Sequence, residues 1–71
     1  MEREPVTSSN ISSVGYEPAS QVLEVEFTNG SVYSYEGVPP EVHRGLVDAP
    51  SVGSAFHSMI RDQYTYTKMG G

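Results

Sequence analysis

Apolar and polar residues alternate through the first half of the chain, which is typical of strands in a sheet with one buried face. Between residues 21 and 27, three apolar side chains alternate with the carboxylates of Glu24 and Glu26. Successive side chains of a strand point to opposite faces of its sheet. The segment therefore predicts an antiparallel strand with one wet side.

A strand is also predicted over residues 12–16, where the same alternation places Val14 and Tyr16 on one face. Residues 17–20 contain a proline suited to a tight turn and would join the two strands. With a loop of these four residues, Val14 lies opposite Leu23 and Tyr16 joins the same apolar face.

The third strand follows Asn29-Gly30, and its register decides the environment of two tyrosines. A two-residue turn there would place Tyr33 opposite Glu26, on the polar face. A three-residue loop with its glycine in a left-handed bulge would instead place Tyr33 opposite Val25, with Tyr35 on the same apolar face. Because a one-residue slip moves every side chain to the other face, the need for burial favours the bulged turn. Under it, both tyrosines are core residues.

Two helices are predicted in the second half of the chain. The first begins at the prolines of residues 39–40 and ends before Pro50. The second is capped by Ser51. Its apolar positions have amphipathic spacing and are Val52, Ala55, Phe56, Met59 and Ile60. Alternation over residues 64–67 then predicts a short terminal strand.

These elements predict an α+β fold, a three-stranded antiparallel meander followed by two short helices packed on one face and a short C-terminal strand. We expect one domain over residues 9–68, with flexible ends at residues 1–8 and 69–71. The side chains expected to be largely buried are Leu23, Val25, Phe27, Tyr33, Tyr35, Val42, Leu46, Phe56 and Ile60. The aromatic members of this set form the structural core signature.

The composition narrows the classes of function. The chain has 71 residues, no cysteine and a formal net charge of −5, with nine acidic residues against four basic ones. It therefore has no disulfide framework, and its charge repels polyanions unless the few cations share one patch. With no apolar run of about 18 residues and no charged leader, we expect no membrane span and a cytoplasmic location.

No metal, cofactor or catalytic site is predicted. His43 and His57 lie on different predicted helices without the spacing of metal ligands, so exposed histidines are expected. A pocket of about 300 Å³ or more is hard to reconcile with so small a core, which argues against an enzyme. Asn10-Ile11-Ser12 and Asn29-Gly30-Ser31 match the glycosylation pattern, which we attribute to chance in a chain without a secretory leader.

An ordered set of motifs runs through nearly the whole chain. It consists of Ser13-Val14-Gly15-Tyr16, Leu23-Glu24-Val25-Glu26-Phe27, Asn29-Gly30, Tyr33-Ser34-Tyr35, Val38-Pro39-Pro40-Glu41-Val42, Gly53, Phe56, Ile60, Tyr64 and Tyr66. The set resembles the KTSC domain, a module named for its position at the C-terminus of some lysyl-tRNA synthetases. The central Tyr-x-Tyr is the family's signature. The length here is similar to that of the stand-alone bacterial members.

The resemblance implies a small non-catalytic binding module, with RNA as the ligand suggested by the synthetase connection. Members of the family often carry a Lys-aromatic-Phe-Asn pattern around the second helix. Here the segment is Ser54-Ala55-Phe56-His57, so a positive charge and an amide are missing. If those groups contact RNA in other members, this chain binds RNA more weakly or not at all.

Two kinds of binding surface therefore follow from the sequence. An RNA surface requires the scattered cations to converge beside exposed rings, and its candidate residues are Arg44, His57, Arg61, Tyr64, Tyr66 and Lys68. The alternative is a protein partner at an exposed strand edge, formed by residues 12–16 or by the terminal strand, with tyrosines at the rim.

Overall fold

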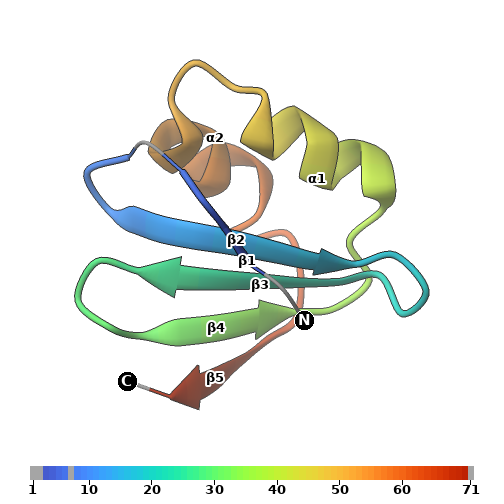
Figure 1. Cartoon of the computed structure of the whole chain (residues 1–71). Coiled ribbons are helices and arrows are strands. Elements are labelled where there is room, and N and C mark those ends of the chain that lie inside the picture. Colours follow the sequence, from blue (N-terminus) through green and yellow to red (C-terminus); the bar gives the residue numbers. More distant parts are fainter. Residues whose placement is uncertain (1–2, 7, 71) are drawn as a thin grey trace.

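The chain folds into one antiparallel sheet with two helices on one of its faces (Figure 1). The structure is a computed structural model that describes residues 3–6 and 8–70. The sheet has five strands in the order β1-β2-β3-β4-β5. The elements are β1 (Arg3–Pro5), β2 (Ile11–Glu17), β3 (Val22–Phe27), β4 (Val32–Tyr35), α1 (Pro40–Val47), α2 (Val52–Met59) and β5 (Tyr66–Gly70). The predicted α+β class and meander are confirmed.

The β3–β4 hairpin closes with the bulged turn that burial favours. Gly30 has a φ of 92° and its N–H donates to the carbonyl of Phe27 at 3.0 Å. The Asn29 side chain accepts a hydrogen bond from the N–H of Ser31 at 3.0 Å. As a result, Tyr33 pairs with Val25, and the predicted register is confirmed.

The β2–β3 hairpin differs from the prediction by two residues. Val14 pairs with Val25 rather than with Leu23, and Tyr16 takes the position opposite Leu23. The reason is the turn, which keeps its length but occupies residues 18–21 instead of 17–20 and ends at Gln21 in the left-handed region, with a φ of 57°. Because a shift of two residues preserves the face of every side chain, Val14 is still buried.

Both ends of the chain extend the sheet beyond the prediction. Residues 1–8 were expected to be flexible, but Arg3–Pro5 pairs with β2 as an additional strand. The Arg3 guanidinium lies 3.0 Å from the Glu24 carboxylate and ties this strand to the sheet. At the other end, β5 begins two residues later than predicted and continues to Gly70. Met1, Glu2, Thr7 and Gly71, which also belong to the expected flexible ends, lie outside the described residues.

These additional pairings change the edges of the sheet. The predicted strand over residues 12–16 is covered by β1 and therefore offers no free edge. Within the described residues, the edge strands are β1 and β5.

The helices follow the capping signals in the sequence. The Ser51 hydroxyl accepts a hydrogen bond from the N–H of Ser54 at 3.3 Å, which confirms the predicted cap of α2. The first helix ends at Val47, slightly earlier than predicted. It packs closely on α2 because Gly45 has no side chain; a Cβ there would lie 3.2 Å from the Met59 methyl group.

The core lies between the helices and the covered face of the sheet. Its buried apolar side chains are Ile11, Val14, Leu23, Val25, Tyr35, Val38, Leu46, Val52, Phe56 and Ile60. Of the side chains expected to be largely buried, Phe27, Tyr33 and Val42 are only half-buried and pack against this core from its margin. The ring of Phe56 lies edge-on to Phe27 and Tyr35, with centroid distances of 5.4 and 5.5 Å.

Replacing Phe56 by alanine should remove much of the stability of the domain. The side chain is 6% exposed, and loss of a buried ring costs about 3–5 kcal/mol of the free energy of unfolding. Domains have about 5–15 kcal/mol in total. Urea unfolding followed by circular dichroism measures the change. Met69→Ala is the control, since Met69 is 59% exposed and should change stability by less than about 0.5 kcal/mol. A loss below about 1 kcal/mol for Phe56→Ala would contradict the central place of this ring.

Candidate functional site

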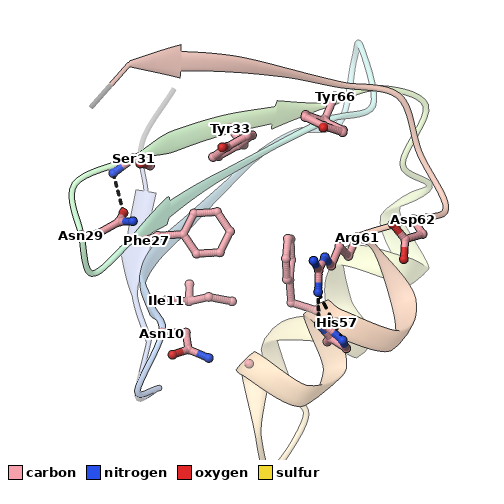
Figure 2. Close-up of a pocket in the computed structure, with 12 residues that line it drawn as sticks. Asn10, Ile11, Phe27, Asn29, Ser31, Tyr33, His57, Arg61, Asp62 and Tyr66 are labelled. Carbon is pink, nitrogen blue, oxygen red and sulfur yellow. Dashed lines mark hydrogen bonds between the residues drawn. The ribbon is translucent and has the colours of Figure 1, made fainter.

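A groove of about 530 Å³ opens between α2 and the sheet. It corrects the sequence-based expectation that no pocket above about 300 Å³ would form. Figure 2 shows its lining residues, which are Asn10, Ile11, Phe27, Asn29, Ser31, Tyr33, Gly53, Phe56, His57, Arg61, Asp62 and Tyr66. The groove forms because Phe56 of α2 packs on Phe27 and Tyr35, while Tyr33 and Tyr66 are not fully covered.

One wall of the groove is a continuous run of aromatic rings. The rings of Tyr33 and Tyr66 have centroids 5.6 Å apart, and Phe27 meets Tyr33 edge-on at 5.6 Å. Tyr66 pairs with Tyr35 across the β4–β5 ladder and is 56% exposed. Strand alternation brings these rings to the helix-facing side of the sheet, where an aromatic surface remains open to a ligand.

The opposite wall carries the nitrogen-rich side chains of His57 and Arg61. They are four residues apart and lie on the same side of α2 and the turn that follows it. The Arg61 Nη1 atom lies 3.1 Å from Nδ1 of His57. Because a guanidinium can only donate, the imidazole nitrogen accepts in this contact and holds the Arg61 head beside the groove.

The negative charge of the chain lies mostly away from this groove. Asp62 is the only carboxylate among the described lining residues. Glu24 and Glu26, which alternate with the core residues of β3, point to the other face of the sheet. There Glu24 pairs with Arg3, and Glu26 accepts a hydrogen bond from the Ser13 hydroxyl at 3.0 Å. The net charge is therefore a poor guide to the charge beside the rings.

The structure brings together only part of the predicted binding surface. His57, Arg61 and Tyr66 line the groove. Lys68 pairs with Tyr33 in the β4–β5 ladder, and strand alternation gives it the face of Tyr66. Tyr64 is half-buried against the core.

Arg44 lies away from the groove. It is on α1 and lines a separate hollow with Tyr16 and His43. The convergence that the sequence analysis required of Arg44, Arg61 and Lys68 therefore does not include Arg44.

Sequence reasoning missed several lining residues. Tyr33 and Phe27 were assigned to the core alone, and Asn10 was considered only as a chance glycosylation match. For Tyr33 the sequence did contain a signal, the predicted terminal strand. Tyr33 pairs with this edge strand, so one side of its ring is left uncovered. No local signal places Asn10 across from α2.

His43 corrects the expectation that both histidines are exposed. Its ring is half-buried and stacks on Tyr16, with centroids 4.6 Å apart and planes 9° from parallel. Loss of hydration lowers the pKa of His43, while nearby Glu4 and Asp48 oppose this shift. The Tyr16 hydroxyl donates to the carbonyl of Val38, so the stack joins α1 to the sheet. His57 is exposed, as predicted.

Two classes of site find no support in the described part of the chain. No group of three or more His, Cys, Asp or Glu side chains is arranged to hold a metal ion among these residues. None of the helices there is long and apolar enough to cross a membrane.

Tyr35, at the base of the aromatic wall, has a strongly shifted ionisation. Burial, reinforced by the neighbouring Tyr33 and Tyr66 hydroxyls, raises the pKa of Tyr35 to about 12, although Arg61 opposes the shift. In the unfolded chain the group ionises near pH 10. Below about pH 10 the phenol is protonated in both states, so it does not favour unfolding.

Stability should therefore fall as the pH rises from about 10 to about 12, because only the unfolded chain gains from ionising Tyr35 over that range. Thermal melts between about pH 8 and pH 11.5 measure the loss. Tyr35→Phe keeps the ring and should show a smaller alkaline loss than the native chain. An equal loss in both proteins would contradict this assignment.

Comparison with known proteins places this geometry in a family. Residues 7–64 match the family model of the KTSC domain. The chain belongs to the KTSC domain family. The crystal structure of a KTSC domain protein from Yersinia pestis is 38% identical, with a TM-score of 0.92, and the match covers 97% of each chain. The resemblance predicted from the motifs is confirmed.

Relatives of this KTSC domain protein occur in two contexts. An uncharacterized protein from Stutzerimonas stutzeri is 45% identical over 64 residues, which are 90% of each chain. A lysine–tRNA ligase from a Nostoc species is 43% identical over 61 residues, 86% of this chain but 11% of the ligase. The same module therefore exists at its own length and as a small part of a much larger protein.

Proposed function

We propose that this KTSC domain protein is a non-catalytic module that binds single-stranded RNA in the groove between α2 and the sheet. The observation that carries the proposal is the joint exposure of the Tyr33 and Tyr66 rings opposite Arg61. Nucleic-acid bases stack on aromatic side chains, and a guanidinium binds phosphate or stacks on a base. The groove thus offers both contacts that an unpaired nucleotide needs.

The size and the charge of the groove support this ligand. Its volume of about 530 Å³ lies within the range of about 300–1,000 Å³ typical of small-molecule sites, which is enough for a short unpaired segment. Lys68 stands in the ladder beside Tyr33, so Arg61 and Lys68 flank the rings. Most of the carboxylates that give the chain its charge of −5 lie elsewhere. The long-range repulsion of RNA therefore weakens affinity without blocking the site itself.

The relatives support RNA over other ligands with flat rings. The module forms part of proteins named lysine–tRNA ligase. Residues 54–57 lack the Lys-aromatic-Phe-Asn pattern, so α2 carries one positive charge fewer than it does in members that have this pattern. We accordingly propose weak, salt-sensitive binding.

Two observations support a non-catalytic role. The Nδ1 and Nε2 atoms of His57 both lie within 3.4 Å of Arg61 Nη1, and no hydroxyl of the described residues hydrogen-bonds to this imidazole. A nucleophile activated by His57 would need such a contact. Tyr66, which lines the groove, is also 56% exposed, so the groove does not exclude water from a reacting group there.

Protein binding is the second candidate function. It is favoured by one observation, the exposed β5 edge with Tyr66 and Met69, whose side chains are 56% and 59% exposed. An extended peptide could add a strand there. This function predicts no response to RNA at any salt concentration.

Replacing each of two arginines by alanine, one inside and one outside the groove, tests the proposed function. Transfer RNA and an unstructured RNA oligomer are titrated into ¹⁵N-labelled protein at about 50 and 200 mM salt, conditions that separate phosphate contacts from other contacts. We expect salt-sensitive shifts at Tyr33, Arg61 and Tyr66. Arg61→Ala should weaken binding several-fold and reduce the salt dependence by about one phosphate contact.

Arg44→Ala is the matched control, because it removes the same charge from the other helix, where Arg44 lines a different hollow. It should leave the salt dependence unchanged. Equal effects of the two variants would mean that the chain responds only to total charge. No shifts at about 50 mM salt would overturn RNA binding and leave the protein-partner function.

Tyr66 separates stacking from hydrogen bonding. Stacking of one base on an aromatic ring contributes about 1–3 kcal/mol, so Tyr66→Ala should weaken RNA binding roughly 5- to 150-fold. Tyr66→Phe retains the ring and should bind within about twofold of the native chain. Fluorescence anisotropy with a labelled oligomer measures both. Thermal melts confirm that each variant is folded. A similar loss in both variants would show that the hydroxyl, not the ring, is the contact.

A further inference from the structure

The groove has a second end, where amide side chains replace the cations. Asn10 and Asn29 stand there on either side of the apolar floor formed by Ile11 and Phe27, as Figure 2 shows. The Asn29 carbonyl oxygen is already engaged by the N–H of Ser31. Among the described residues, no hydrogen bond to the Asn10 side-chain amide is present. As far as the described residues go, Asn10 therefore offers a free donor and acceptor to whatever occupies the groove.

Hydrogen bonds hold the backbone around Asn10, although its side chain has no such partner within residues 3–6 and 8–70. The Ser8 hydroxyl accepts hydrogen bonds from the N–H groups of Asn10 at 3.2 Å and Ile11 at 3.3 Å. The Asn10 carbonyl accepts a hydrogen bond from the N–H of Thr28 at 2.9 Å. These contacts fix the segment that carries the amide before a ligand arrives, which reduces the entropy lost on binding.

Gly53 of α2 keeps this end of the groove open. A Cβ at that position would lie 3.0 Å from the Ser8 hydroxyl oxygen and 4.0 Å from the Asn10 amide nitrogen. Any side chain would therefore press on the turn that presents Asn10. The bare backbone of α2 at Gly53 allows the turn to approach the helix and leaves the amide at the rim.

We propose that Asn10 reads the base that stacks in this groove and that the preferred base is adenine. This inference rests on the proposed RNA function. An asparagine amide pairs with adenine through two bonds: its oxygen accepts from the N6 amino group and its nitrogen donates to N7. A purine also covers more of the Tyr33 ring with its two fused rings than a pyrimidine covers with one, while Phe27 stands edge-on to Tyr33 and borders the stacked base.

The two ends of the groove have different roles under this proposal: one binds nucleotides of any sequence and the other selects the base. Arg61 and Tyr66, with Lys68 beside them, bind any unpaired nucleotide, because phosphate contacts and stacking carry little sequence information. Asn10 adds selectivity for the base. A change at Asn10 should therefore alter which RNA is preferred more than whether RNA is bound.

Short homopolymers test the inference on the native chain. Labelled oligomers of adenylate, cytidylate, guanylate and uridylate are compared by fluorescence anisotropy at about 50 mM salt. We expect adenylate to bind on the order of tenfold more tightly than the pyrimidine oligomers. Replacing adenine by 7-deazaadenine removes the N7 acceptor while leaving the stacking area, and it should abolish most of this preference.

Variants assign the preference to one side chain. Asn10→Asp retains the shape of the side chain but loses both N–H donors, so the adenylate preference should disappear. Ser12→Asp adds the same charge at an exposed position of β2 that does not line the groove. It should lower all affinities equally and keep the preference. Thermal melts verify that both variants are folded.

The outcomes distinguish the inference from the proposed function. Equal binding of all four oligomers overturns the reading by Asn10 and leaves RNA binding in place. An adenylate preference that survives in Asn10→Asp also overturns it, since another group must then read the base. No binding of any oligomer overturns the proposed function together with the inference. A preference lost both with 7-deazaadenine and with Asn10→Asp supports the inference.

Discussion

The bulged turn at Gly30 sets which face of β4 meets the helices, and with it the position of the aromatic rings. With Gly30 at a φ of 92°, β4 pairs with β3 so that Tyr33 and Tyr35 face the helices. A turn one residue shorter would exchange the two faces of β4 and place these rings beside the carboxylates of β3. Core packing and the aromatic wall of the groove thus share one cause. An L-residue side chain at this position would be strained by the left-handed backbone rather than by lack of space, since nothing lies within 4 Å of a Cβ there.

The groove follows from how little of the sheet a short helix can cover. α2 has eight residues and buries Val52 and Phe56, and the Phe56 ring packs against Phe27 and Tyr35. Tyr33 is half-buried and Tyr66 exposed, so the aromatic surface extends beyond the helix. In a domain of this size the same rings must stabilise the core and offer a binding surface. Tyr35 represents the first role and Tyr66 the second.

The carboxylates of β3 and the cations nearest the rings lie on different faces of the sheet, so the net charge does not describe either face. The β3 carboxylates lie on the side of the sheet away from the helices, where Arg3 and Ser13 engage them. The cations nearest the rings, Arg61 and Lys68, are on the other side. A net charge of −5 coexists with a groove that holds a single carboxylate among its described lining residues. Electrostatic arguments from composition describe long-range behaviour, whereas binding depends on the groups within a few ångströms.

The class of fold, the order of the central strands and helices, and the register of the β3–β4 hairpin can be predicted from the amino-acid sequence. These features depend on local alternation, a glycine at a required left-handed position and a serine cap, all of which act over a few residues. Three contacts could not be predicted in this way: Arg3–Pro5 joins the sheet, His43 stacks on Tyr16, and Asn10 lies across from α2. The second and third of these contacts join segments distant in the chain, so their energy comes from surfaces that exist only after folding. The first joins consecutive strands, but it is supported by the ion pair between Arg3 and Glu24 of β3, which local alternation does not indicate.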